Sequence, residues 1–75
     1  MNTIKIFPLN DAELGYLFFQ KRDKKGISLR NAAKELNSSY ASLNRFENGK
    51  QFLSMKKIIE YANYLELDLK FCVTD

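Results

Sequence analysis

Residues Ile27–Lys50 read ISLRNAAKELNSSYASLNRFENGK, and this stretch decides the fold. Ser28 and Ser39 each precede a run of helix-forming residues. Serine is favoured there because its side chain accepts a hydrogen bond from a free backbone amide at the start of a helix. Asn37 lies between the two runs, and asparagine tolerates a left-handed backbone better than other non-glycine residues do. The pattern predicts two short helices joined by a tight turn, over Leu29–Leu36 and Tyr40–Glu47.

Apolar residues at helical spacing indicate how these two helices pack. The first carries Ala32, Ala33 and Leu36 on one side, and the second carries Leu43 and Phe46. The small alanines permit another helix to approach closely. We therefore expect a helix-turn-helix pair whose remaining faces are polar.

The flanking segments predict two more helices. Asn10–Glu13 has the pattern of a capping box, and the helix that it begins should run to about Lys24, where Gly26 supplies a left-handed residue to end it. Ser54 is placed to cap a last helix over Met55–Leu65. The residues expected to enter the core from these helices are Leu14, Leu17, Phe18, Ile58, Ile59, Ala62 and Leu65.

Both ends of the chain have strand-like patterns. Thr3–Phe7 alternates loosely, and Leu67–Val73 alternates apolar with polar residues as far as Cys72. An isolated strand cannot satisfy its own backbone groups, so the second strand should pair either with a second copy of the chain or with Thr3–Phe7. The predicted fold is all-α, with four to five helices and a short C-terminal β-strand. We expect one domain over residues 1–75, with a helical core over 8–65 and the strand over 67–73.

The composition argues against several functional classes. Histidine is absent and Cys72 is the single cysteine, so we expect neither a metal site nor an intrachain disulfide. A Gly-rich phosphate loop and a clear nucleophile–base pair are also missing, so we expect no cofactor and no enzyme activity. The longest apolar run, Leu17–Phe19, is too short to span a membrane, and Met1–Pro8 does not resemble a signal peptide. These features predict a cytoplasmic protein.

The charge of the chain is unevenly distributed. Residues 21–57 contain ten basic and three acidic residues, a balance of +7, whereas the rest contains two basic and six acidic residues, a balance of −4. A basic middle is what a face that binds a polyanion requires, although charges also serve simply to solvate a surface.

The helix predicted over Tyr40–Glu47 has a polar outer face with short side chains at its start. Such a helix fits the major groove of double-stranded DNA, where its first residues reach base edges. We expect bases to be read by Tyr40, Ala41, Ser42, Asn44 and Arg45. We expect phosphates to be held near the two serine caps and by basic side chains, namely at Ser28, Arg30, Ser39 and Lys50. The alternatives are a Tyr40 ring packed on a neighbouring side chain, and Ser42 and Asn44 that are merely solvated.

The same stretch resembles the helix-turn-helix of the Cro/C1-type (XRE) repressors, of which a typical member reads roughly LSxxELAxxLGxSxxxISRxENGK. The matching residues are Ile27, Ser28, Ala33, Leu36, Ser39, Leu43, Arg45 and Glu47–Lys50. Asn37 stands at the usual glycine. Leu29 stands at the usual glutamine, which leaves that residue's phosphate contact to a substitute such as Arg30. The resemblance implies a lambda-repressor-like domain that binds DNA in a sequence-specific manner.

The resemblance implies two further roles. Arg22 and Glu47 occupy positions where many members have a buried ion pair that joins the first helix to the end of the recognition helix; two solvated charges are the alternative. Asn48, Gly49 and Lys50 match a loop that grips phosphate through backbone amides and the lysine; a plain helix cap is the alternative, and both roles are compatible.

The two ends, Lys5–Phe7 before the first helix and Leu65–Leu67 followed by the alternating Asp68–Cys72, resemble those of HipB-type antitoxins. In that group the terminal strand pairs across a homodimer, and the protein represses its own operon and binds a HipA-type kinase toxin. The resemblance implies an intersubunit sheet formed here by Leu67, Leu69, Phe71 and Val73, and an operator with an inverted repeat. Alternatives are a stand-alone phage or plasmid repressor and a protein-interaction module without DNA binding.

Four aromatic residues exceed what the core of so small a domain needs: Tyr16, Phe19, Tyr61 and Tyr64. We expect some of them to face a second subunit or a toxin, with an aromatic-rich core as the default.

Overall fold

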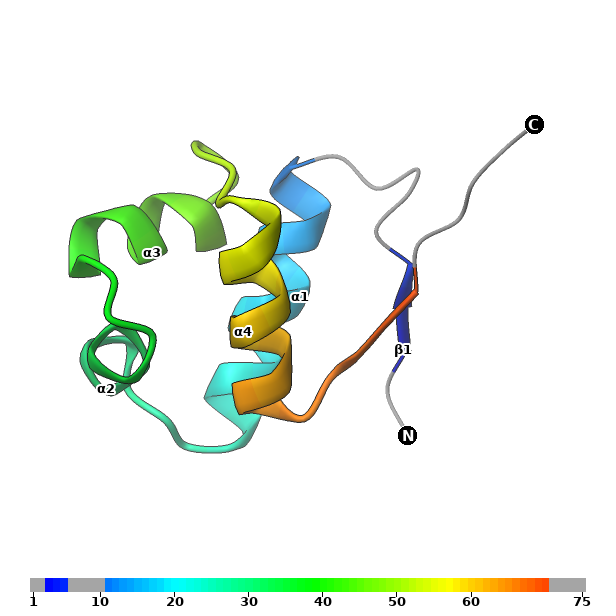
Figure 1. Cartoon of the computed structure of the whole chain (residues 1–75), viewed down its shortest axis with the longest axis horizontal. Coiled ribbons are helices and arrows are strands. Elements are labelled where there is room, and N and C mark those ends of the chain that lie inside the picture. The colour runs from blue at the N-terminus through cyan, green and yellow to red at the C-terminus, as the bar shows by residue number, and fades with distance from the viewer. Residues whose placement is uncertain (1–2, 6–10, 71–75) are drawn as a thin grey trace.

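Four helices fill residues 11–65 of the computed structural model, which describes residues 3–5 and 11–70 (Figure 1). Two short strands flank them. The elements are β1 (Thr3–Lys5), α1 (Asp11–Lys24), α2 (Leu29–Glu35), α3 (Tyr40–Glu47), α4 (Met55–Leu65) and β2 (Asp68–Lys70). The predicted all-α fold with a short C-terminal strand is confirmed, and α2 ends one residue earlier than we expected.

Serine side chains begin three of the helices, as predicted. Ser28 accepts a hydrogen bond of 3.0 Å from the Asn31 amide, and Ser39 accepts one of 3.0 Å from the Ser42 amide. Ser54 accepts a longer one, of 3.2 Å, at the start of α4. Asn10, in the capping box predicted for α1, lies outside the described residues.

All four helices end in the same way, with a left-handed residue that lets two backbone amides bond back to the helix. These residues are Gly26, Asn37, Gly49 and Glu66, with φ angles of 70°, 52°, 75° and 61°. Glu66 was not predicted there. It has a side chain where the left-handed region favours glycine, and its carboxylate forms an ion pair with Lys25 at the end of α1.

The core contains most of the predicted apolar residues and differs from the prediction at two positions in α4. Ile59 is 41% exposed, whereas Tyr61 is fully buried. The buried side of α4 is formed by Ile58, Tyr61, Ala62 and Leu65, so the helical repeat turns Ile59 away from the core. Our assignment of Ile59 to the core was therefore wrong, and Tyr61 belongs to the aromatic-rich core.

Two glycines allow α1 to lie close to the end of α3. A Cβ atom added at Gly15 would meet the carbonyl oxygen of Phe46 at 2.0 Å, and one at Gly49 would meet the Ala12 Cα at 2.6 Å. No other residue type fits either place without a shift of the backbone, so these contacts fix where α3 sits relative to α1.

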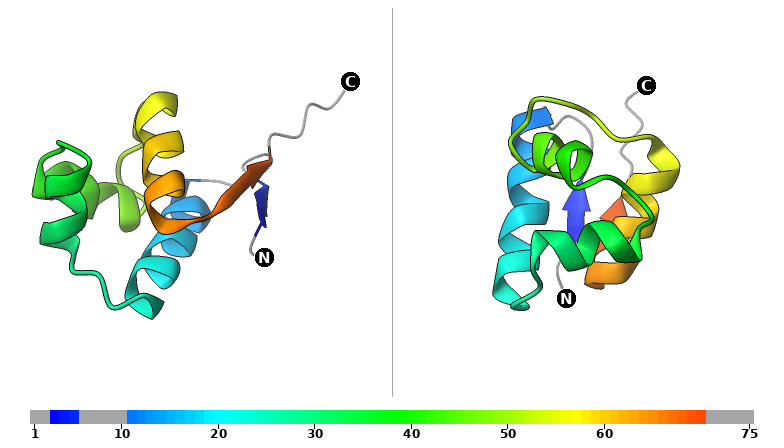
Figure 2. Two further views of the ribbon diagram at one scale, coloured as in Figure 1. Left: turned by 60° about the horizontal axis from the view of Figure 1, so that its bottom comes forward. Right: turned by 90° about the vertical axis from the view of Figure 1, so that its left-hand side faces the viewer.

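The strands form a two-stranded parallel sheet in which Thr3, Ile4 and Lys5 align with Asp68, Leu69 and Lys70. The sheet lies on the opposite side of the α1–α4 pair from α2 and α3 (Figures 1 and 2). The described structure thus shows the pairing within one chain that we considered as an alternative.

The residues predicted to form the intersubunit sheet fall into three groups. Leu67 is buried in the core of its own chain, so it does not offer a surface to a second subunit, and our assignment is corrected there. Leu69 lies within β2. Phe71 and Val73 lie outside the described residues.

Candidate nucleic-acid interface

The outer face of α3 is open to solvent while its inner face is anchored in the core. Leu43, Phe46 and Glu47 are buried. The residues predicted to read bases lie on the other side, where Tyr40, Ala41, Asn44 and Arg45 are exposed and Ser42 is half-buried. With α2 packed against its start, α3 presents this face at one end of the molecule, away from the sheet (Figure 2).

Side-chain contacts order the start of this face. The guanidinium carbon of Arg30, on α2, lies 5.9 Å from the centroid of the Tyr40 ring, on α3. Tyr40 therefore packs on a neighbouring side chain while remaining 51% exposed. This cation–π interaction links α2 to α3 across the turn between them.

The far end of the same face is held by amide groups. The Arg45 Nε donates a hydrogen bond of 2.7 Å to the Gln51 side chain, and the Asn48 Nδ2 donates to the backbone and side-chain oxygens of Asn44, at 2.8 and 3.1 Å. These bonds hold Arg45, Asn44 and Asn48 in one arrangement on the surface of the free protein.

The loop after α3 behaves as a helix cap. The backbone amides of Asn48, Gly49 and Lys50 donate to carbonyl oxygens of α3 at 3.1, 3.1 and 2.9 Å. These amides already have partners within the chain, so the structure offers no free amide there for the phosphate contact implied by the resemblance. The exposed Lys50 side chain is the part of the loop left for that role.

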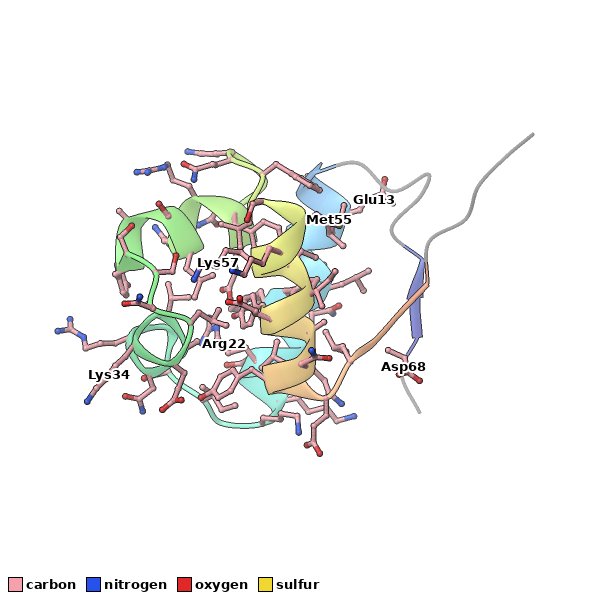
Figure 3. The ribbon with its side chains drawn as sticks, in the orientation of Figure 1. Glu13, Arg22, Lys34, Met55, Lys57 and Asp68 are labelled. Atoms are coloured by element: carbon pink, nitrogen blue, oxygen red, sulfur yellow. The ribbon has the colours of Figure 1, made fainter. Side chains whose placement is uncertain are left out.

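A buried ion pair joins α1 to the end of α3, as the resemblance implies. The Arg22 Nε and Nη2 atoms donate to the two oxygens of the Glu47 carboxylate, each at 2.9 Å. The Arg22 Nη1 donates to the carbonyl oxygen of Ile27 at 2.8 Å, which ties in the turn before α2. Figure 3 shows Arg22 among the helices, whereas Lys34 points outward from α2.

Tyr61 adds a third member to this group. Its hydroxyl donates to the Oε2 atom of Glu47, so the carboxylate at the end of α3 is bound from both α1 and α4. Burial raises the pKa of the Tyr61 phenol, with a further contribution from its hydrogen bond to Glu47, and the hydrogen bond to Glu47 raises the pKa of Arg22. Sequence reasoning missed this role, although Tyr61 lies three residues after Ile58 and four before Leu65, on the apolar side of α4.

Within residues 3–5 and 11–70, the structure shows ion pairs for three basic residues of the central segment: Arg22, Lys25 and Lys57. Arg30, Arg45 and Lys50 are exposed on or beside the outer face of α3. Positive charge is therefore left where a polyanion would meet this helix.

A groove of about 260 Å³ lies next to α3, and sequence reasoning did not predict it. It is lined from α1, α2, α3 and the residue after α3, by Tyr16, Phe19, Arg22, Leu29, Asn44, Glu47 and Asn48.

Over residues 3–5 and 11–70, no cluster of three or more metal-binding side chains occurs, and no helix is long and apolar enough to cross a membrane.

Comparison with known proteins agrees with this arrangement. The model of the family described as "Helix-turn-helix" matches residues 19–71. Two crystal structures of the clp gene regulator ClgR from Corynebacterium glutamicum are similar to the chain at 26% identity over 81% of its length, with TM-scores of 0.76 and 0.75. The chain spans 65% of the first of these structures and 78% of the second. A comparison with curated protein sequences found no match.

Proposed function

The chain belongs to the helix-turn-helix family, and from that premise we propose that it binds double-stranded DNA in the major groove and represses transcription. The observation that carries the proposal is the outer face of α3, which is polar, rich in short side chains and flanked by exposed cations, while its inner face is locked into the core. A helix that served as a protein-docking element would more often expose apolar anchors.

The residues divide by the part of the DNA that they meet. Tyr40, Ala41, Ser42, Asn44 and Arg45 are the base-reading set. The phosphate-holding set comprises Ser28, Arg30, Ser39, Asn48 and Lys50. The side chain of Asn48 is held in place by its hydrogen bonds to Asn44. Phosphate contacts set the register of the protein on the duplex, and contacts to base edges supply the specificity.

We propose that the active form is a homodimer on an inverted repeat. One α3 reads only a few base pairs, and a two-fold dimer places two such helices in successive major grooves, roughly 34 Å apart. The open edge of the β1–β2 sheet, together with Leu69, Phe71 and Val73, is the surface that we assign to the second subunit. We also propose that the protein works in the cytoplasm.

The finer proposal is that the chain is a HipB-like antitoxin, which represses its own operon and binds a HipA-type kinase toxin. Its support is the pair of strands that flank the four helices, at the two ends that carry the resemblance. The direct check is to express the chain with the product of the adjacent gene. A stable complex of the two, together with relief of that protein's toxicity, is the expected result.

The experiment that tests DNA binding is a salt titration of affinity for an inverted repeat from upstream of the gene, with a scrambled duplex of equal length as the control. We expect strong preference for the repeat and a steep loss of affinity as salt rises, because each phosphate contact releases counterions. Equally weak binding to both duplexes at low salt would overturn the proposal and favour a protein-interaction module.

A further inference from the structure

The groove beside α3 has aromatic walls. The Tyr16 and Phe19 rings, one turn apart on α1, stack at a centroid distance of 6.1 Å and an interplanar angle of 27°. Tyr16 is 56% exposed and Phe19 is 38% exposed, although both are large side chains. No hydrogen bond occupies the Tyr16 hydroxyl within the described part of the chain.

The groove is continuous with the outer face of α3. Asn44 and Asn48 line the groove, and they are also the residues whose amides are bonded together at the end of that face. Leu29, from the first turn of α2, lines it from the other side. A duplex lying against α3 therefore runs past the mouth of this groove.

The chemistry of the groove suits a sugar better than a bare anion. It is lined by the Arg22–Glu47 ion pair, whose charges cancel, and by the largely apolar side chains of Tyr16, Phe19 and Leu29. Deoxyribose presents C–H groups that pack on aromatic faces, and each sugar is followed by a phosphate that accepts hydrogen bonds. Tyrosine combines an apolar ring with a polar tip, which matches both parts.

We infer that the Tyr16–Phe19 groove receives the sugar–phosphate backbone at the edge of the DNA site, with the sugar against the two rings and the phosphate bonded to the Tyr16 hydroxyl. This inference rests on the proposed function, and it extends the DNA contact from α3 onto α1.

The test alters one group on each side of the proposed hydrogen bond between Tyr16 and the phosphate. Tyr16→Phe deletes only the hydroxyl, and a duplex with a neutral methylphosphonate at one position removes one phosphate charge. We expect Tyr16→Phe to weaken binding of the operator and of scrambled DNA alike, by about tenfold, the usual effect of losing a hydrogen bond to a charged group. At one flanking position the methylphosphonate should weaken the wild type but leave Tyr16→Phe unchanged, because the bond is already absent.

Tyr64→Phe is the matched control, because it deletes a hydroxyl from a half-buried tyrosine on α4 that does not line the groove. We expect it to bind DNA as the wild type does. Equal affinities of wild type and Tyr16→Phe, or independent effects of the variant and every methylphosphonate, would overturn the inference alone. Sedimentation of the free protein measures its oligomeric state. If Phe19→Ala changed that state but left the affinity for DNA unchanged, the groove would be assigned to a second copy of the chain instead. Failure of the wild type to bind any duplex would overturn both this inference and the proposed function.

Discussion

Arg22 on α1 and Glu47 at the end of α3 are joined by two parallel hydrogen bonds of 2.9 Å, with side chains only 11% and 5% exposed. The pair fixes the last turn of α3 to α1. Tyr61 closes the group from α4, so three helices meet at one carboxylate. The position of the proposed DNA-reading face thus depends on polar groups inside the fold.

Removal of one partner of this pair should destabilise the protein strongly. We expect Arg22→Ala to lower the free energy of unfolding by about 3–5 kcal/mol, because the Glu47 carboxylate is left buried without its cation. Urea unfolding measures the change. The double variant Arg22→Met/Glu47→Leu is the control, and it should recover much of the loss because no buried charge remains. A loss below about 1 kcal/mol for Arg22→Ala would show that the pair behaves as a solvated one.

The protein should lose stability in alkali through Tyr61. Burial raises the pKa of this phenol in the folded state, so above a pH of about 10 the unfolded chain binds fewer protons than the native one. The contribution of the protonated Tyr61 phenol to the free energy of unfolding is therefore complete below that pH and declines as the pH rises above it. The urea midpoint measured from pH 8 to pH 11 should fall more steeply for the wild type than for Tyr61→Phe. Parallel curves would contradict the assignment.

Gly15→Ala should destabilise the protein although alanine is normally the better helix residue. The new methyl group would meet the Phe46 carbonyl oxygen at 2.0 Å, and neither backbone has room to move without disturbing the other. We expect a loss of about 1–3 kcal/mol by thermal unfolding, against a normal gain of about 1 kcal/mol for such a change in an exposed helix. Gln20→Ala, at an exposed position of α1, is the control and should have little effect.

Glu66→Gly should stabilise the protein by about 0.5–1 kcal/mol. Glu66 has a φ angle of 61°, which costs a residue with a Cβ atom more than it costs glycine. Its ion pair with Lys25 is exposed on the glutamate side, and surface pairs of this kind contribute little. Glu66→Ala keeps the backbone strain but loses the ion pair, so it should be no more stable than the wild type. A glycine variant less stable than the alanine variant would show that the ion pair dominates.

Arg45 and Lys50 should differ in their effect on DNA binding. Arg45→Ala should relax or abolish the preference for the operator, because its side chain is proposed to read bases, whereas Lys50→Ala should weaken operator and random DNA equally. The measurement is the affinity of each variant for the operator and for random DNA at one salt concentration, compared with the affinities of the wild type. Equal losses on both duplexes for Arg45→Ala would assign Arg45 to the backbone instead of to bases.

Local chemistry explains why so much of the fold was predictable. Ser28, Ser39 and Ser54 predict helix starts, because each side chain accepts a hydrogen bond from a backbone amide a few residues on. Gly26 and Asn37 predict helix ends, because each tolerates the left-handed backbone that ends a helix. Such signals need no knowledge of the rest of the chain. The resemblance added the Arg22–Glu47 pair, which no local pattern reveals.

The remainder depended on packing between distant residues. The helical spacing of α4 favours Tyr61 over Ile59 as a core residue. Its role becomes visible only in the packed structure, where its ring lies against Phe18 and Phe46. The groove between Tyr16 and Asn48 is likewise a product of three helices and leaves no periodic trace. Glu66 was missed for the opposite reason, because its own residue type argues against the conformation that it adopts.

The β1–β2 pairing has a kinetic consequence. The contacts between helices close shorter stretches of chain, such as the 25 residues that separate Arg22 from Glu47, whereas Thr3 aligns with Asp68 at the other end of the sequence. Pairing ends this far apart requires closure of nearly the whole chain, and its entropic cost is lowest once the helices have already shortened the path. The strand pair should therefore form last and open first, so that β2 passes through states in which both of its edges are free.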